Sequence, residues 1–231
     1  MFGNKKVSRV GVETTSTTNS LRERTTQLHN AAEHSTFQKS LLKGSLQLPE
    51  YISFLSQLYL IHKNLEERLR VTAISDPTCG PLILACRFRE GSLKNDLESL
   101  GRREEDISPL KATRSYLRSM DRAVAAVPRA ILGYFYVLEG STNGGRFIAK
   151  AVRRTFHLHE TGSTYFDPYG ESQLTYWREF KGMMDAIPLE LHEFSAIEQA
   201  AMDTFRAVVE IGDEILASRR AASVESQICV G

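Results

Sequence analysis

Residues 131–148 read ILGYFYVLEGSTNGGRFI, and this stretch decides the fold of the chain. Apolar residues keep helical spacing before and after the glycines, which indicates helix on both sides of them. Gly140, Gly144 and Gly145 nevertheless fall inside the pattern, and each costs about 1 kcal/mol relative to alanine in a helix interior. A helix of this composition needs either a bend or a bare backbone against another group.

Two interpretations of these glycines are open on the residues alone. Without Cβ atoms at 140, 144 and 145, one side of the helix becomes a flat surface on which a planar ligand could lie. Alternatively, a second helix packs closely into the groove between Gly140 and Gly144. A phosphate-binding loop is excluded, because the stretch lacks a GxxxxGK[ST] motif and the glycines neither follow a strand nor begin a helix.

Helical periodicity extends over the rest of the chain. A capping box at residues 20–23 opens a helix that runs to about His34, a short helix ends at Gly44, and Pro49 suits the first turn of a long third helix. Further helical patterns cover residues near 92–100, 109–126, 171–186 and 189–219. Sustained two-residue alternation is absent. We therefore predict an all-α fold, a single domain of about seven or eight helices over residues 20–219, with disordered tails at 1–19 and 220–231.

The composition is that of an ordinary globular protein. The 231 residues include 29 Lys plus Arg and 28 Asp plus Glu, giving a net charge of +1, which disfavours general nucleic-acid binding. The longest strongly apolar run, residues 131–138, is far too short to cross a bilayer. Three widely spaced cysteines and the lack of a secretory signal favour a reduced chain in the cytoplasm.

Two histidines lie within helical patterns, and neither identifies a site by itself. His29 precedes Glu33 by one helical turn, and His62 has apolar neighbours typical of a core position. An isolated helical histidine is more often structural than a metal ligand, and the chain has no HExxH zinc motif. A Ser-His-Asp or Cys-His arrangement cannot be assembled with any specificity either.

The chain resembles the heme oxygenase family when its motifs are taken together. Residues 21–33, LRERTTQLHNAAE, are similar to the family's first-helix signature, with a Leu-x-x-x-Thr-x-x-x-His-x-x-Ala-Glu core. Residues 51–67 match the following helix in spacing, and Gly140-Ser-x-x-Gly-Gly145 looks like the kinked distal helix. The likeness runs from about residue 20 to residue 219, with the two signatures in the family's order.

The resemblance implies that heme lies between the first helix and the kinked glycine-rich helix of a helical bundle. His29 occupies the position of the proximal iron ligand, and neutral imidazole suits heme iron. Glu33 matches the residue that orients this imidazole by hydrogen bonding. Gly140, Gly144 and Gly145 match residues whose bare backbone approaches the distal face of the heme.

The resemblance also implies roles for five further residues. Many members carry aspartate where this chain has Ser141, and Asn143 would help Ser141 to hold the distal water. Arg22 and Lys181 match basic positions that anchor the heme propionates, and Phe135 stands where some members have a tyrosine near a propionate. The sequence around Ser141 is closer to some bacterial members, including those encoded beside phytochromes.

The implied reaction is the oxidative cleavage of heme to biliverdin by a monooxygenase, with release of iron and carbon monoxide. Heme is then both substrate and cofactor, and O2 and electrons are consumed. The electron donor would be a reductase, a ferredoxin or a flavodoxin, and the biliverdin acceptor could be a phytochrome.

Two alternatives keep the fold and change the activity. The first is a heme-binding or heme-sensing protein without turnover, which Ser141 keeps open. The second is a non-heme member of the wider superfamily, either a di-iron protein or a thiaminase-like hydrolase. The di-iron version has one candidate pair, His62 and Glu66, and the hydrolase would need Cys79 or Cys86 in a pocket.

Overall fold

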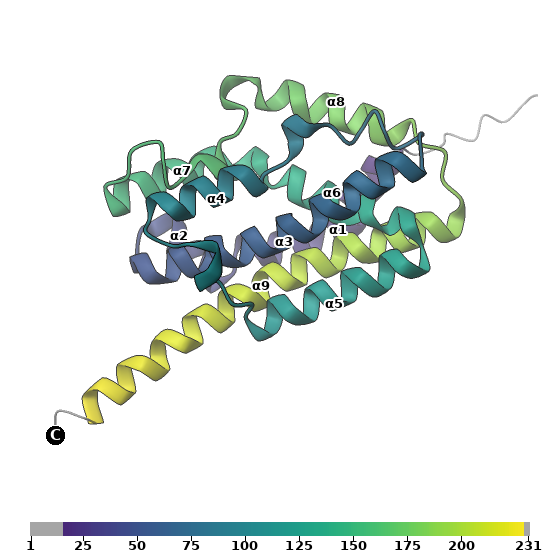
Figure 1. Ribbon diagram of the computed structural model, residues 1–231. Coiled ribbons are helices and arrows are strands. Elements are labelled where there is room, and N and C mark those ends of the chain that lie inside the picture. Colours follow the sequence, from purple (N-terminus) through teal and green to yellow (C-terminus); the bar gives the residue numbers. More distant parts are fainter. Residues whose placement is uncertain (1–15, 229–231) are drawn as a thin grey trace, which may run out of the picture.

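The computed structural model of the protein describes residues 16–228, and within this range it contains helices and no strand (Figure 1). The α-helices are α1 (Thr17–Glu33), α2 (Thr36–Lys43), α3 (Leu48–Ser75), α4 (Glu90–Ser99), α5 (Lys111–Ala126), α6 (Ile131–Gly140), α7 (Thr142–Phe156), α8 (Gln173–Asp185) and α9 (Leu191–Ile228). Short 3-10 turns connect several of them: η1 (Ala85–Arg87), η2 (Glu104–Asp106), η3 (Pro128–Ala130), η4 (Thr164–Phe166) and η5 (Gly170–Ser172). The all-α prediction is confirmed, with nine α-helices in the described range.

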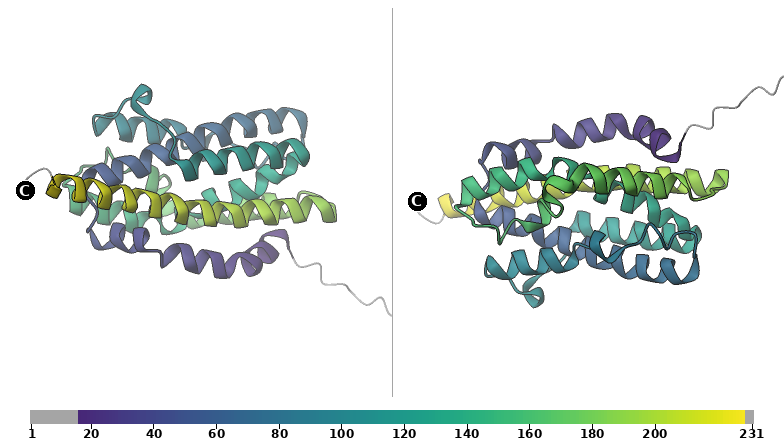
Figure 2. Two further views of the ribbon diagram at one scale, coloured as in Figure 1. Left: turned by 90° about the horizontal axis from the view of Figure 1, so that it is seen from below. Right: turned by 90° about the horizontal axis from the view of Figure 1, so that it is seen from above.

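Helix α9 is the central support of the bundle, since α1, α3, α5 and α6 all pack against it. Figure 2 shows α1 and α2 along one edge of the molecule, α3, α4 and α5 along the opposite edge, and α6 to α9 between them. Gly133 allows α6 to lie unusually close to α9, because a Cβ atom there would be 2.0 Å from the Ile197 carbonyl oxygen. The most apolar helix is thereby fixed against the longest one.

The first helix begins earlier than the sequence analysis predicts. Ser16 caps α1 by accepting a hydrogen bond from the backbone N–H of Asn19, so the predicted capping box at Ser20 is wrong. The backbone N–H and hydroxyl of Thr18 also donate to the Asp185 carboxylate at the end of α8, at 2.8 and 3.0 Å. This long-range anchor holds the extra turn in place, and a local capping pattern gives no information about it.

The last helix also extends beyond its predicted end. Helix α9 continues to Ile228, whereas the sequence pattern indicates an end near Arg219. The predicted tails at 1–19 and 220–231 therefore overlap with helix at residues 17–19 and 220–228. The remainder of both predicted tails lies outside the described residues.

Local features of the prediction are confirmed where they depend on single residues. Gly44 ends α2 in the left-handed conformation, with φ of 73°, and Pro49 lies in the first turn of α3. Cys79 and Cys86 are both free thiols. Within residues 16–228, no helix has the length and hydropathy needed to span a bilayer.

Arg129 connects three separate segments at one end of the bundle. Its guanidinium donates to the Asp76 carboxylate at 2.7 Å, the Pro188 carbonyl at 2.6 Å and the Glu193 carboxylate at 3.1 Å. These partners lie after α3, before α9 and in the first turn of α9. Arg129, helped by two hydrogen bonds from Thr78, holds the pKa of Asp76 well below its usual range.

We expect Asp76→Asn to lower the Tm by about 2–4 °C at pH 7, which corresponds to about 1 kcal/mol for a chain of this size. A carboxyl whose pKa is depressed in the folded state stabilises the protein above its unfolded pKa, about 3.9, and loses this contribution as the pH falls further. The difference between variant and wild type should therefore shrink below about pH 4. Thermal unfolding from pH 7 to pH 2.5 measures it.

The matched control is Asp121→Asn, because Asp121 forms a more exposed ion pair with Arg68 at 2.6 Å. Such exposed pairs contribute about 0–1 kcal/mol. A pH-independent loss of Tm in Asp76→Asn would contradict the proposed electrostatic origin.

Candidate functional site

The glycine-rich stretch forms two helices rather than one, with a break at Ser141 between α6 and α7. Three consecutive side chains at the break donate hydrogen bonds to carbonyl oxygens three residues earlier: Ser141 to Leu138 at 2.7 Å, Thr142 to Glu139 at 2.6 Å and Asn143 to Gly140 at 2.8 Å. Short polar side chains compete in this way with helical backbone bonds. The break is therefore specified locally by the Ser-Thr-Asn sequence.

The three glycines around the break have different structural roles. A Cβ atom at Gly145 would lie 2.0 Å from the Phe166 carbonyl oxygen, and one at Gly140 would lie 3.2 Å from the Trp177 ring. At Gly144 nothing lies within 4 Å of the corresponding position. Gly140 and Gly145 thus permit close packing within the protein, but the groove from Gly140 to Gly144 that the packing interpretation supposes is not filled at Gly144. Gly144 leaves a bare backbone facing open space, as the ligand interpretation supposes.

Helix α1 carries a polar stripe on the edge of the bundle. Arg22, Thr26, His29 and Glu33 follow each other at spacings of four, three and four residues, so they share one face of the helix. The His29 side chain is 52% exposed, and its Nε2 atom lies 3.6 Å from Glu33 Oε1. Its ring also meets Phe205 of α9 edge-on, with 5.6 Å between centroids. His29 is thus accessible, and the contact with Phe205 restricts its orientation.

Two predicted basic anchors lie beside the same aromatic pair. The ammonium of Lys181 lies 5.8 Å from the centre of the Trp177 ring, and Trp177 packs against Tyr136 at 5.5 Å. Burial raises the pKa of Tyr136, and the positive charge of Arg22 opposes this shift. Arg22 and Lys181 are far apart in the sequence, and the fold brings their helices to the same aromatic pair, since the Tyr136 hydroxyl donates to the Thr18 carbonyl one turn before Arg22.

Phe135 lies behind this surface. Its ring is 2% exposed and meets Phe180 edge-on at 5.1 Å. The next residue, Tyr136, has a phenol hydroxyl that donates to the Thr18 carbonyl at 3.4 Å. Sequence reasoning missed Tyr136 and Trp177. The sequence did offer one indication of Trp177, because this residue lies one helical turn before the predicted anchor Lys181.

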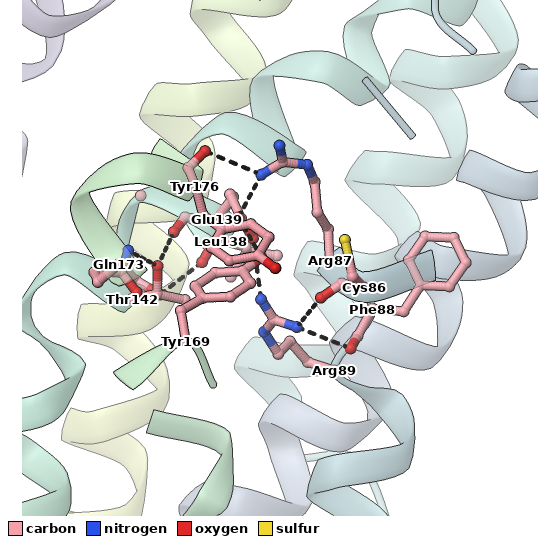
Figure 3. A network of polar contacts seen from close by, with 12 residues as sticks. Cys86, Arg87, Phe88, Arg89, Leu138, Glu139, Thr142, Tyr169, Gln173 and Tyr176 are labelled. Atoms are coloured by element: carbon pink, nitrogen blue, oxygen red, sulfur yellow. Dashed lines mark hydrogen bonds and ion pairs between the residues drawn. The ribbon is translucent and has the colours of Figure 1, made fainter. Parts of the chain in front are cut away.

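A buried network of charges lies behind the break (Figure 3). Arg87 and Arg89, from the segment between α3 and α4, both pair with the Glu139 carboxylate, at 3.0 and 3.5 Å. The Tyr169 hydroxyl donates to the same carboxylate at 2.6 Å. All three charged side chains are at most 4% exposed, and Arg87 also donates to the Tyr176 carbonyl at 3.3 Å. The residue that precedes Gly140 is thus held by two cations and a phenol.

Sequence reasoning did not predict this network. The one indication of the network in the sequence is a glutamate at the end of an otherwise apolar run, residues 131–139. Arg87 and Arg89 give no signal of their own, because arginine is usually a surface residue.

Three observations bear on the non-heme alternatives. Within residues 16–228, no group of three or more His, Cys, Asp or Glu side chains is arranged to hold a metal ion. His62 is 3% exposed, which confirms its predicted core position. Burial raises the pKa of Cys79 to about 11, so this thiol stays protonated and is a poor nucleophile near neutral pH.

A model of the heme oxygenase family matches residues 15–213. The chain belongs to the heme oxygenase family. A heme oxygenase from Pyropia yezoensis is 25% identical over 205 residues, which cover 87% of this chain and 86% of the relative. Heme oxygenase 1 of Synechocystis is 23% identical over 201 residues, covering 84% and 82% of the two chains.

Solved structures of heme oxygenases share the fold. Heme oxygenase-1 from Synechocystis sp. PCC6803, solved in complex with heme, has a TM-score of 0.83 at 19% identity and covers 94% of this chain and 100% of its own. The heme oxygenase from Leptospira interrogans has a TM-score of 0.79 at 24% identity and covers 87% and 100%.

Heme fits the residues present in this heme oxygenase family member. Imidazole is a common axial ligand of heme iron, and the other ring nitrogen of His29 would remain available to Glu33. Because nothing lies within 4 Å of the Cβ position at Gly144, the backbone there is open to contact with a ligand. Arg22 and Lys181 would supply the positive charge that two propionates require.

Proposed function

We propose that this protein is a heme oxygenase that cleaves heme oxidatively to biliverdin and releases iron and carbon monoxide. The reaction consumes O2 and electrons from an external donor. The observation that carries the proposal is the accessible His29 beside Glu33, on the face of α1 that also bears Arg22. This chemistry is supplied by the bound heme itself, and the protein supplies orientation and a controlled environment.

His29 would hold the iron on one side of the ring, and Glu33 would orient its imidazole. Arg22 and Lys181 would bind the propionates and so set the rotation of the ring in its site. Phe135 supports this end from behind through Phe180. Rotation of the ring decides which edge faces the reacting side, so these two cations determine the biliverdin isomer.

The distal side would be formed by the break between α6 and α7. Gly144 would leave room for the ring, and Gly140 and Gly145 let the break pack closely against Trp177 and Phe166. Ser141 and Asn143 are exposed at this surface, and both have polar atoms able to hold water. Serine carries no charge, so these two side chains together would do the work of the aspartate that many relatives have.

The remaining assignments are the electron donor, the acceptor of biliverdin and the location of the protein in the cell. We propose a reductase, ferredoxin or flavodoxin as electron donor, a phytochrome as an acceptor of biliverdin, and the cytoplasm as the location.

A hemin titration followed by reduction in air tests the proposal. With ascorbate or a ferredoxin system, and with catalase present to remove free peroxide, the Soret band should disappear while a broad red biliverdin band grows. A stoichiometric complex that never turns over would instead identify a heme-binding protein. Failure to bind hemin would exclude both functions.

We expect Gly144→Leu to weaken hemin binding by about tenfold or more, because the side chain would occupy the open space that the ring needs. A clash worth about 1.4 kcal/mol is enough for this effect. Gly91→Leu is the matched control, since Gly91 in α4 also has nothing within 4 Å of its Cβ position. Equal hemin affinity in both variants would place the ligand elsewhere.

A further inference from the structure

Helix α8 carries a row of four side chains that includes the predicted anchor Lys181. Side chains four residues apart lie along one row of a helix surface. In α8 this row consists of Gln173, Trp177, Lys181 and Asp185. It runs from the first residue of the helix to the last, a length of about 18 Å at about 1.5 Å per residue. We refer to these four side chains as the α8 ridge.

The first residue of the ridge is bound to the beginning of α7. Gln173 Nε2 donates to the Thr142 hydroxyl at 2.7 Å (Figure 3) and to Asn143 Oδ1 at 3.3 Å. Both acceptors are themselves held, since Thr142 donates to the Glu139 carbonyl at 2.6 Å and Asn143 donates to the Gly140 carbonyl at 2.8 Å. The single hydrogen of the Thr142 hydroxyl is thereby used, so its oxygen accepts from Gln173. Gln173 therefore fastens α8 to the two residues that begin α7.

The orientation of the Gln173 amide is fixed by these two acceptors. Its Oε1 atom is buried and has no hydrogen-bond partner among the described residues. A buried acceptor without a partner costs free energy, but turning the amide over would place Oε1 against the oxygens of Thr142 and Asn143. Both N–H groups of Gln173 are therefore committed to α7.

The last residue of the ridge is bound to α1. Asp185 accepts hydrogen bonds from the backbone N–H and the hydroxyl of Thr18, at 2.8 and 3.0 Å. Thr18 lies in the first turn of α1 and is 3% exposed. Between the two ends, the Trp177 ring packs against Gly140 and against Tyr136. Helix α8 is thus held at its ends to α1 and α7, the two helices between which the heme is proposed to lie.

We propose that α8 is a brace that fixes the distance between α1 and the break, with Gln173 and Asp185 as the positioning residues at its two ends. The inference rests on the proposed function, because it assumes that the heme lies between α1 and α7. Gln173 holds the brace beside Gly144, and Asp185 holds it to the helix that bears His29. Lys181 belongs to the same ridge, so the brace also sets where this predicted propionate anchor lies relative to the break.

The brace would control the rotation of the bound ring. A heme ring is nearly square, so contacts at its rim decide how it is rotated about the axis through the iron. Without the two directional bonds of Gln173, apolar packing such as that of Trp177 remains, and apolar contacts do not fix a position along the helix. Lys181 would then shift relative to the break, and the ring would rotate with it. Loss of the brace should therefore change the ratio of biliverdin isomers.

Trp177 measures the brace in the protein without heme, because it is the single tryptophan of the chain. In Gln173→Leu, which keeps the bulk of the side chain and removes both donors, acrylamide should quench Trp177 fluorescence about twofold more strongly, since α8 opens locally more often. Thr142→Val removes the nearer acceptor and should have the same effect. In the double variant the two effects should not add, because both changes break one contact. Full additivity, or wild-type quenching in both single variants, would overturn the brace.

The hemin complex provides the second test. Hemin should dissociate about tenfold faster from Gln173→Leu and from Asp185→Ala, equivalent to about 1.4 kcal/mol, because the gap between α1 and α7 widens more easily. Turnover of both variants should give a ratio of biliverdin isomers different from that of wild type. The matched control is Gln199→Leu, since the Gln199 amide donates to Asp203 at 2.7 Å within α9. Its hemin dissociation rate and isomer ratio should equal those of wild type.

The stability of Gln173→Leu separates a brace from a merely structural contact. Its Tm should stay within about 2 °C of wild type. A larger loss of Tm with an unchanged isomer ratio would overturn the brace, and so would a wild-type hemin dissociation rate; the proposed function would stand in both cases. Failure of the wild type to degrade bound heme would instead overturn the proposed function, and the quenching and dissociation rates would still test the brace.

Discussion

His29→Ala is expected to lower heme turnover at least about 100-fold, equivalent to about 2.7 kcal/mol of lost transition-state stabilisation. Without the imidazole, the proposed ligand of the heme iron would be missing, and the ring would lose its orientation toward Ser141. The hemin complex should then show an altered Soret maximum. The fold should be unaffected, because the side chain is 52% exposed. Absorption and electron paramagnetic resonance spectra of the ferric complex measure the change in ligation.

The matched control for this prediction is His34→Ala. His34 is another exposed histidine at the end of α1, and its Nδ1 atom is already engaged with the Asn30 carbonyl at 2.8 Å. Its spectra and turnover should match those of wild type. Added imidazole should restore the axial spectrum of His29→Ala by filling the space left by the side chain. Unchanged spectra and turnover in His29→Ala would refute the assignment of this residue as the iron ligand.

Glu139→Gln is expected to lower the free energy of unfolding by about 3–5 kcal/mol, the effect of removing one partner of a buried ion pair. Arg87 and Arg89 would then be left buried without a counter-charge on α6. Both lie at most 4% exposed beside this carboxylate, so water cannot replace it without a rearrangement of the loop between α3 and α4. Urea unfolding at pH 7 measures the loss.

The matched control is Glu198→Gln, which removes the same charge from a pair with Arg24 at the surface. In that pair Arg24 Nη1 lies 3.0 Å from Glu198 Oε2, and the Arg24 side chain is 57% exposed. The expected loss in the free energy of unfolding is at most about 1 kcal/mol. Hydrogen exchange should also become faster at residues 141–145 in Glu139→Gln, because Glu139 directly precedes the break. Equal stability of both variants would show that the network is hydrated and contributes nothing.

The glycine-rich stretch shows how far the sequence could be interpreted. The cost of three glycines in a helix is a local property, and so is the preference of Ser141, Thr142 and Asn143 for nearby carbonyls. A break at this place was therefore predictable. Which glycine faces open space was not, because that depends on Trp177 and Phe166 arriving from distant segments.

Some residues of the candidate site were likewise predictable from the sequence, and others were not. The stripe of Arg22, His29 and Glu33 follows from helical spacing within α1, and family resemblance identifies its residues. Tyr136 and Trp177 join the site only because α6 and α8 meet there. The contact between Gln173 and Thr142 spans 31 positions of the chain, and no local pattern relates the two.

The sequence by itself determined the helical class, the break after Gly140 and the face of α1 that bears His29. Each of these depends on interactions within one or two helical turns, which the order of residues specifies directly. Only the tertiary structure decided that Gly144 is the open glycine, that Glu139 holds two buried arginines, and that α1 begins with Ser16. These features depend on groups far apart in the chain, whose burial and charge are set by the packing of α1, α6, α8 and α9 against one another.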